Sequence, residues 1–227
     1  MRFVYSTLVA AASAAVLMGT ASAQSNLERM LNVQTTGTSF AAKLIDQTGP
    51  KAENIKKNLE RVRLPAGFKI SLYAIVPDAR HMAVAPQGTV MWVGTRKVSV
   101  YTVTDRDRDR VADEVEAFAP PLDWKVPNGV CISKDGFLFT VEANRVLVFP
   151  AAEFFWENPD VAVGIVVPEG ELVPASEVSY NHGARVCRVG PDNKLYISLG
   201  QPYNVPPKAK SDLYKQWGIG GIIRMNR

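Results

Sequence analysis

Acidic and basic residues alternate in residues 104–116, which read TDRDRDRVADEVE. If Asp105 is position one, carboxylates fall at positions one, three, five, nine and twelve of the run. Twelve-residue calcium loops use these positions, because a hard cation prefers oxygen ligands and a final Glu can bind it with both oxygens. The run therefore predicts a calcium site formed by Asp105, Asp107, Asp109, Asp113 and Glu116.

A second interpretation of the same run is a charged surface turn. Arg110 occupies position six, where calcium loops need Gly for a sharp bend, and Arg106 and Arg108 offset part of the negative charge. The run is also expected between strands, whereas calcium loops of this type lie between helices. Arg–carboxylate pairs at a surface contribute little to stability individually. The sequence leaves both interpretations open.

His182 is the second candidate for chemistry, in the run SYNHGARVCRVGPDNKLYISLG. It lies in a polar loop ahead of a strand that we expect to begin near Ala184. Imidazole titrates close to neutral pH, so it can take a proton from a substrate hydroxyl. A single loop histidine can equally have no chemical role. The glycines of QWGIGGII are predicted to form a turn, because the Lys-Ser/Thr of a phosphate loop does not follow them.

The first residues of the 227-residue chain predict export. One Arg, a short apolar run and Ala-Ser-Ala precede Gln24, which is typical of a signal peptide at residues 1–23, cleaved after Ala23. The apolar run is shorter than the about 20 residues that span a bilayer, and we expect no membrane span and a periplasmic protein. The net charge of +4 comes without a Lys/Arg block interleaved with aromatics, which argues against nucleic-acid binding.

Cys131 and Cys187 are the two cysteines of the chain. Export would permit a disulfide between them, and two separately buried thiols are the alternative because each cysteine lies in an apolar run. No CxxCH motif is present, which excludes covalently attached c-type haem. His81 and His182 are the two histidines and stand far apart in sequence, so a Cys/His zinc site is not expected.

Two regions follow the signal peptide. Residues 24–63 are expected to form a helical or loosely ordered extension that packs on the main domain. Within it KAENIKKNLERVRLP predicts a helix that Pro65 stops, with Ile55, Leu59 and Val62 on one face. After Pro65 the sequence changes to short β-branched and aromatic runs, of which FKISLYAIV is the first predicted strand.

A pattern of strand, tight turn, strand, gap and strand then recurs about every 50 residues. The three copies have turns at residues 86–88, 134–136 and 191–193, where Gly or Asn can adopt a positive φ. Small antiparallel sheets in series predict an all-β fold, with residues 64–227 forming about three blades of a β-propeller. Three blades do not close a ring, so we expect the N-terminal half of a larger propeller or a truncated product of one.

Six segments together resemble the soluble-type glucose/sorbosone dehydrogenases, in order from about Arg63 to Arg227. They are RLPAGFKISLYA, ARHMAVAPQGTVMWVGTR, DRDRDRVADEVE, PNGVCISKDGFLFTVEANRVLVF, NHGARVCRVGPDNKLYISLGQPYNV and GIGGIIRMNR. That family consists of periplasmic six-bladed propellers that use pyrroloquinoline quinone and calcium. The sequence is more similar to the sorbosone-dehydrogenase-like branch than to glucose dehydrogenase proper.

The resemblance implies oxidation of a sugar by hydride transfer to the quinone. His182 matches the family's general base, and calcium polarises the quinone carbonyl that receives the hydride. Asn181 stands where glucose dehydrogenases often have Asp, so it is the substrate-binding candidate, and the sugar and the electron acceptor are not identified. Most of the family's cofactor residues follow the segment IIRMNR, so this chain is expected to be inactive alone. The acidic run would hold a separate structural ion.

Two other functions remain open. A calcium-dependent sugar lactonase with six blades would need acidic and Asn ligands on an axial metal, and the loops offer Asn128, Glu142, Asn144 and Asn181. A non-catalytic propeller that binds protein or sugar is the third hypothesis.

Overall fold

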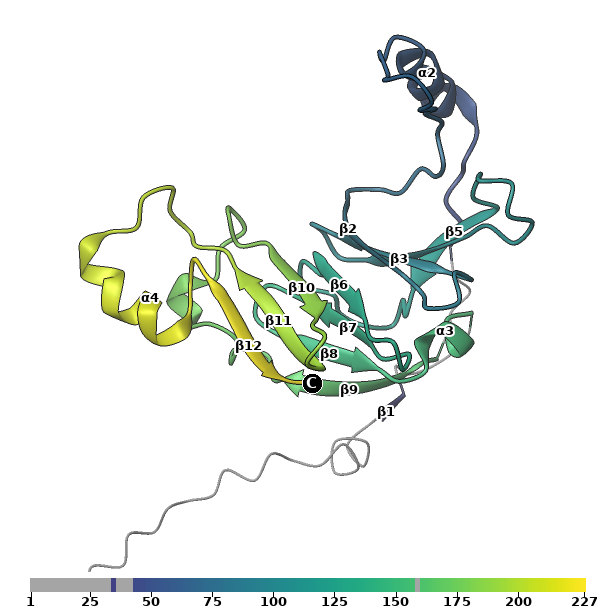
Figure 1. The fold of residues 1–227 in the computed structure, drawn as a ribbon. Coiled ribbons are helices and arrows are strands. Elements are labelled where there is room, and N and C mark those ends of the chain that lie inside the picture. Colours follow the sequence, from purple (N-terminus) through teal and green to yellow (C-terminus); the bar gives the residue numbers. More distant parts are fainter. Residues whose placement is uncertain (1–33, 36–42, 158–159) are drawn as a thin grey trace, which may run out of the picture.

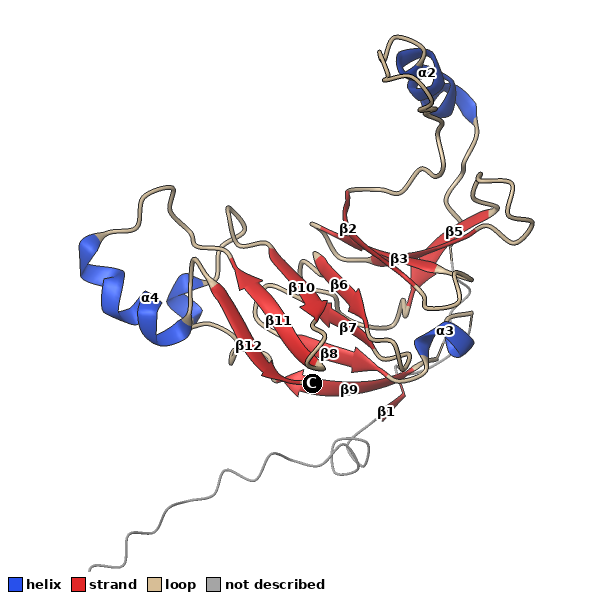
Figure 2. Cartoon of the chain, viewed as in Figure 1, coloured by secondary structure: helices blue, strands red, loops and turns tan. Residues whose placement is uncertain are grey.

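The computed structural model describes residues 34–35, 43–157 and 160–227. Strands are the main regular structure of the described residues and form three antiparallel sheets, which confirms the prediction of a mainly β fold (Figures 1 and 2). The predicted signal peptide, residues 1–23, and much of the start of the predicted extension, residues 24–63, lie outside the described residues. Among the described helices, none has both the length and the apolar character required to cross a membrane.

The first sheet is a meander of four strands in sequence order. Its strands are β2 (Ala79–Val84), β3 (Met91–Thr95), β4 (Val100–Thr104) and β5 (Glu114–Phe118). The predicted turn between β2 and β3 is confirmed: Gly88 has φ 73°, and its N–H donates to the Ala85 carbonyl at 2.9 Å. The sequence does not predict β5, because its alternating acidic and apolar residues fall within the run interpreted as a metal loop.

The second sheet has the same meander and one added strand at its outer edge. It contains β6 (Gly129–Ile132), β7 (Leu138–Val141), β8 (Val146–Phe149), β9 (Ala162–Val167) and, beside β9, β1 (Gln34–Thr35). The predicted turn between β6 and β7 is confirmed by Gly136, which has φ 87° and donates to the Ser133 carbonyl at 3.0 Å. A short helix, α3 (Ala152–Phe155), links β8 to β9.

The third sheet contains β10 (Arg185–Val189), β11 (Lys194–Leu199) and β12 (Ile222–Asn226). Its predicted turn is also confirmed, because Asn193 has φ 60° and donates to the Gly190 carbonyl at 3.0 Å. Between β11 and β12 the chain forms a 3₁₀ turn (Lys208–Lys210) and α4 (Ser211–Trp217).

We call the segment between β11 and β12, residues 200–221, the insertion. Glu177 anchors it to the segment that precedes β10. It ends the 3₁₀ turn Ala175–Glu177, and its side chain is buried. Its carboxylate accepts hydrogen bonds from Lys210 Nζ at 2.6 Å and from Tyr214 Oη at 2.8 Å. The contact fixes α4 beside the loop that carries Asn181 and His182.

The inner strands β2, β6 and β10 lie side by side, with β6 in the middle (Figure 1). Neighbouring sheets also approach closely at two glycines, Gly94 in β3 and Gly129 in β6. A Cβ atom on Gly94 would meet the carbonyl oxygens of Pro127 and Asn128, and one on Gly129 would meet the Arg185 carbonyl oxygen at 2.7 Å. Asn128 Nδ2 also donates to the Arg185 carbonyl at 2.8 Å. Small residues therefore set the spacing between successive sheets.

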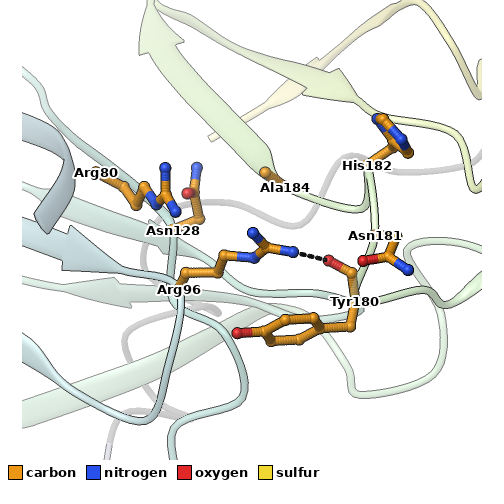
Figure 3. Close-up of a pocket in the computed structure, with 7 residues that line it drawn as sticks. All are labelled: Arg80, Arg96, Asn128, Tyr180, Asn181, His182 and Ala184. Carbon is orange, nitrogen blue, oxygen red and sulfur yellow. Dashed lines mark hydrogen bonds between the residues drawn. The ribbon is translucent and has the colours of Figure 1, made fainter. Parts of the chain in front are cut away.

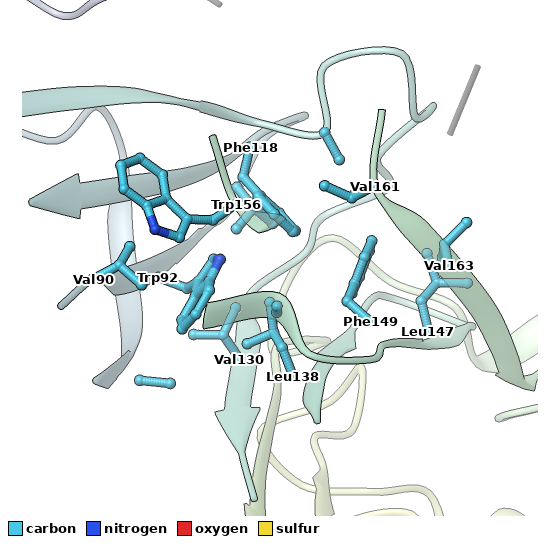
Figure 4. Close-up of a cluster of buried hydrophobic side chains, with 14 of the residues drawn as sticks. Val90, Trp92, Phe118, Val130, Leu138, Leu147, Phe149, Trp156, Val161 and Val163 are labelled. Carbon is cyan, nitrogen blue, oxygen red and sulfur yellow. The ribbon is translucent and has the colours of Figure 1, made fainter. Parts of the chain in front are cut away.

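Two apolar cores fill the spaces between successive sheets. Between the first and second sheets, Phe118 packs edge-on against Trp92 and Phe149, with ring centroids 6.2 and 5.0 Å apart (Figure 4). The core between the second and third sheets contains a disulfide between Cys131 and Cys187, whose Cα atoms are 5.7 Å apart. Of the two alternatives for the cysteines, the structure contains the disulfide.

The N-terminal helix is confirmed, but it is shorter than the sequence predicts. It is α2 (Gly49–Leu59), which ends six residues before Pro65 and leaves Val62 45% exposed. Asp46 accepts hydrogen bonds from the N–H and hydroxyl of Thr48 and so shapes the entry to the helix.

The predicted strand FKISLYAIV is wrong, because residues 68–76 form no strand. The segment runs along the first sheet and is held mainly by a side chain. The Ile75 N–H donates to Gln47 Oε1 at 2.6 Å, and Gln47 Nε2 donates back to the Ile75 carbonyl at 3.1 Å. One further backbone bond joins the Ala112 N–H to the Tyr73 carbonyl. The apolar pattern reflects partial burial, and it did not distinguish a side-chain anchor from a strand partner.

Candidate functional site

His182 lies in the loop between Glu177 and β10, with its side chain exposed. Its φ of 55° is unusual for a residue with a Cβ atom. Two glycines make this backbone path possible, because a Cβ atom on Gly183 would meet the Ser179 carbonyl oxygen and one on Gly200 would meet the His182 carbonyl oxygen. Among the described residues the His182 imidazole has no hydrogen-bond partner. It is therefore available to a ligand.

One cleft, of about 360 Å³, lies beside His182 (Figure 3). It is formed by strand ends and loops of all three sheets. Its lining residues are Arg80, Arg96, Asn128, Tyr180, Asn181, His182 and Ala184. The cleft thus places the predicted substrate residue Asn181 and the predicted base His182 together with two guanidinium groups.

A second cleft, of about 480 Å³, lies on the other side of the same histidine. His182 and Ala184 line both clefts. The second cleft is otherwise built from the end of β11, the insertion and the turn before β12, and it includes Gln201, Tyr203 and Asn204. His182 can therefore contact a ligand that enters from either side.

Arg185, at the start of β10, stabilises the loop that carries His182. Its side chain is 1% exposed, and its Nη1 donates to the Gly200 carbonyl at 2.9 Å. Within the described ranges Arg185 Nε has no partner and no carboxylate pairs with the guanidinium. Burial lowers the pKa of Arg185 to about 10. This contact ties the start of β10 to the residue that follows β11.

The strand pairing explains why Arg80 and Arg96 lie together. Ala79 pairs with Thr95 across β2 and β3, so the residues next to them are at the same end of the hairpin. Arg96 is then held by the third sheet's loop: its Nη2 donates to the Tyr180 carbonyl at 3.1 Å, and its guanidinium lies 4.3 Å from the centre of the Tyr180 ring.

Sequence reasoning missed both of these arginines. The signal that could have found them is their place at matching ends of the first predicted hairpin.

His81, the other histidine, lines neither of these two clefts. Its Nδ1 accepts a hydrogen bond from the Val130 N–H at 3.3 Å. Burial lowers its pKa, and the charge of Arg188 acts in the same direction. His81 therefore packs between the first and second sheets.

The acidic run is partly assembled. Asp105, Asp107 and Asp109 each offer a carboxylate oxygen, and these oxygens lie within 4.8 Å of one another. Asp113 is directed elsewhere, because its Oδ2 accepts from the Arg106 N–H at 2.5 Å, and Glu116 lies in β5 opposite Thr102. The structure thus brings three of the five predicted ligands together.

Arg110 shapes this loop as a bending glycine would. It has φ 75°, and its N–H donates to Asp105 Oδ2 at 3.1 Å. The loop also has the ion pairs expected of a charged surface turn, because Arg106 contacts Glu114 at 3.2 Å and Glu157 at 2.5 Å. Features of both sequence interpretations are therefore present.

The residues considered for a lactonase metal site have other contacts. Glu142 is buried and binds Arg145 and the Lys125 N–H, and burial raises its pKa. Asn144 bonds both backbone groups of Val173. Of that set, Asn128 and Asn181 share the cleft beside His182.

Neither a protein-family model nor a curated protein sequence matches the chain. Among solved structures, the calcium structure of a Trichoderma reesei carbohydrate-active enzyme of family AA12 is similar, with a TM-score of 0.54, 18% identity and coverage of 71% of this chain and 38% of that one. The iodide structure of the AA12 enzyme gives a TM-score of 0.53, 18% identity and coverage of 71% and 39%. A gluconolactonase from Xanthomonas campestris, XC5397, gives a TM-score of 0.43, 18% identity and coverage of 60% and 40%.

The chain therefore spans about two fifths of the length of these proteins. At this identity, the similarity to the AA12 structures concerns the fold.

Proposed function

We propose that the chain is part of a sugar dehydrogenase of the soluble glucose/sorbosone type, which oxidises an aldose or sorbosone-like substrate by hydride transfer to pyrroloquinoline quinone. In this proposal residues 64–227 form three blades of a six-bladed propeller, and residues 24–63 precede them as an extension. The observation that carries the proposal is the position of His182: an exposed imidazole without a partner in the described chain, at a cleft formed by all three sheets. The similarity to the fold of a carbohydrate-active enzyme supports it.

In the proposed reaction His182 is the general base. One of its ring nitrogens takes the proton of a substrate hydroxyl while a hydride leaves the carbon that bears this hydroxyl. Asn181 would orient the substrate through its amide, and the glycines at 183 and 200 would keep the loop in place. Arg185 acts on the loop through Gly200 and is a positioning residue.

The residues of the cleft fit the proposed cofactor. No acidic side chain lines the cleft among the described residues, and the polar groups there are guanidinium, amide, phenol and imidazole. Such a set suits a quinone that carries carboxylates. Pyrroloquinoline quinone, with its calcium ion, would supply the acceptor for the hydride.

We also propose that the protein is exported to the periplasm and that its signal peptide is cleaved after Ala23. The disulfide between Cys131 and Cys187 supports an oxidising compartment, because such bonds persist there and are rare in the cytosol.

The test is dye reduction by the natural full-length protein, with aldoses and with and without the quinone and calcium. His182→Ala should lower kcat by about 10²- to 10⁴-fold, the usual contribution of a general base. Binding of the quinone, measured by its absorbance, should change little. His81→Asn is the matched control, because Asn keeps an acceptor for the Val130 N–H and the residue lies outside the clefts; its rate should stay near that of the wild type.

Three results would contradict the proposal. Dye reduction that persists in His182→Ala would exclude the base. Hydrolysis of sugar lactones without the quinone would favour the lactonase. Binding of sugar with neither activity would favour a non-catalytic propeller.

We further propose that Asp105, Asp107 and Asp109 bind a structural calcium ion, without Asp113 and Glu116, whose positions in the structure are set by other contacts. An ion that binds the folded state alone stabilises it by about 2.7 kcal/mol at 100 times its Kd. Calcium should therefore raise the Tm of the wild type, and EGTA should reverse the change. Asp105→Asn should lose most of the shift, and Glu114→Gln, which removes a neighbouring charge from the Arg106 ion pair, should keep it. Equal shifts in both variants would favour the surface-turn interpretation.

A further inference from the structure

Arg80 and Arg96 are the charged residues that line the cleft beside His182, within the described part of the chain. We infer that they form a binding site for a carboxylate group on a small hydroxylated ligand. A guanidinium group matches a carboxylate with two parallel N–H···O bonds, so two of them at one end of a hairpin form a strong anion site.

The positive charge of this cleft is not balanced by the described residues. Arg80 has no hydrogen bond or ion pair with them. The nearest acid in sequence, Asp78, pairs with Lys97 at 3.0 Å and so is engaged elsewhere. An anion that enters the cleft therefore meets positive charge without a competing carboxylate.

The two arginines differ in how firmly they are held. Arg96 is fixed by the Tyr180 carbonyl and by the face of the Tyr180 ring, which leaves its other N–H groups for a ligand. Figure 3 shows Arg80 beside Asn128, with Arg96 extended toward Tyr180 and His182 farther along the same cleft. One preorganised guanidinium and one unpaired guanidinium can bind a ligand from two sides with little loss of order in Arg96.

Guanidinium groups bind phosphate as well as carboxylate, so the choice between the two rests on the rest of the lining. Phosphate sites commonly use the N–H groups of a helix N-terminus or a glycine-rich loop. This cleft instead combines planar guanidinium groups with the side-chain amides of Asn128 and Asn181. Amides suit hydroxyl groups, and guanidinium groups suit a carboxylate. The ligand class is therefore a polyhydroxylated acid or a cofactor that bears carboxylates.

These two sources are distinguished by the probes. D-Glucuronate carries hydroxyls and a carboxylate, D-glucose lacks the carboxylate, and pyrroloquinoline quinone carries carboxylates without being a sugar. The inference rests on the proposed function only for the reaction that follows binding. Binding itself is measured by calorimetry, which can succeed when no dye is reduced, so the two proposals can fail separately.

The experiment titrates each probe into wild type, Arg80→Gln, Arg96→Lys and Arg63→Gln, with folding of each variant checked by its Tm. We expect D-glucuronate or the quinone to bind and D-glucose to bind more weakly. Arg80→Gln should weaken the binding about tenfold or more, because a hydrogen bond to a charged group is lost. Arg96→Lys keeps the charge but loses the paired geometry and should weaken it less. Arg63→Gln removes an exposed arginine outside the cleft and should have no effect.

Salt gives an independent readout, because raising the ionic strength should weaken binding of the acid and leave that of glucose unchanged. Tighter binding of glucuronate than of the quinone would assign the site to the substrate, and the reverse would assign it to the cofactor. Inorganic phosphate is titrated as a further probe. The inference is overturned if neither D-glucuronate nor the quinone binds, if phosphate binds as tightly as these two ligands, or if Arg80→Gln binds them like the wild type.

Discussion

Cys131 in β6 and Cys187 in β10 form a disulfide that joins the inner strands of the second and third sheets. The bond closes a loop with a sequence separation of 56. The loss of chain entropy in the unfolded state then corresponds to about 4 kcal/mol of stability. The double variant Cys131→Ala, Cys187→Ala should therefore have a free energy of unfolding lower by about that amount in urea denaturation. An unchanged midpoint would show that the core between these sheets does not depend on the bond.

Gly200 should not tolerate a side chain. A Cβ atom there would meet the carbonyl oxygen of His182, so Gly200→Ala must displace the loop. We expect a loss of about 2 kcal/mol in urea denaturation, within the range for overpacking. Gly170→Ala is the control, because its Cβ would have no neighbour within 4 Å and it tests only the strain of φ 90°. An unchanged free energy of unfolding in Gly200→Ala would show that the loop accommodates the contact with His182 at no cost.

Arg110→Gly should stabilise the protein. Arg110 has φ 75°, a conformation that costs roughly 1–2 kcal/mol for a residue with a Cβ atom. This cost exceeds the roughly 0.4–1 kcal/mol that a glycine loses because it adds disorder to the unfolded chain. The hydrogen bond to Asp105 comes from the backbone N–H and is retained. A rise in Tm is the expected result. Arg63→Gly, at an exposed position without a positive φ, should instead lower the Tm slightly because glycine adds disorder to the unfolded chain.

The contact of Glu177 should depend on pH. The hydrogen bond from Lys210 holds the pKa of Glu177 below its ordinary value of 4.5, and the hydroxyl of Tyr214 acts in the same direction. A lowered pKa in the folded state means that the stabilisation is complete above pH 4.5 and is lost as the pH falls through the folded-state pKa. The Tm difference between wild type and Glu177→Gln should shrink on acidification. For Glu171→Gln, which changes an exposed residue, the difference should stay small at every pH.

Local signals predicted much of the fold. Three hairpin turns depend on residues within the turn, and the positive φ of Gly88, Gly136 and Asn193 was predictable from residue type alone. The N-terminal helix likewise follows from its own spacing. The segment FKISLYAIV was not predictable in this way, because its partner is the side chain of Gln47, which stands far away in sequence. The strand β5 was missed because the acidic residues at its half-buried positions resemble metal ligands.

The candidate site was predictable only in part. Asn181 and His182 are adjacent in the sequence, and the structure places both at one cleft. Arg80 and Arg96 lie at matching ends of one hairpin, but their meeting with the third sheet's loop depends on a contact 84 residues apart in sequence, which no local spacing encodes. The acidic run shows another limit: the spacing predicted that Asp105, Asp107 and Asp109 lie together, but not that pairing of β5 directs Glu116 into a sheet.

The molecule has two kinds of position: closely packed glycines such as Gly94 and Gly129, and residues that line the clefts. At Gly94 and Gly129 there is no room for a side chain, because neighbouring backbones occupy the space that it would need. The residues at positions 96, 181 and 203 lie on strand ends and loops that line the clefts. A mutant library confined to these positions could alter ligand choice while the scaffold stays intact. Directed evolution of this protein would therefore start from the rim of the clefts and leave the glycines unchanged.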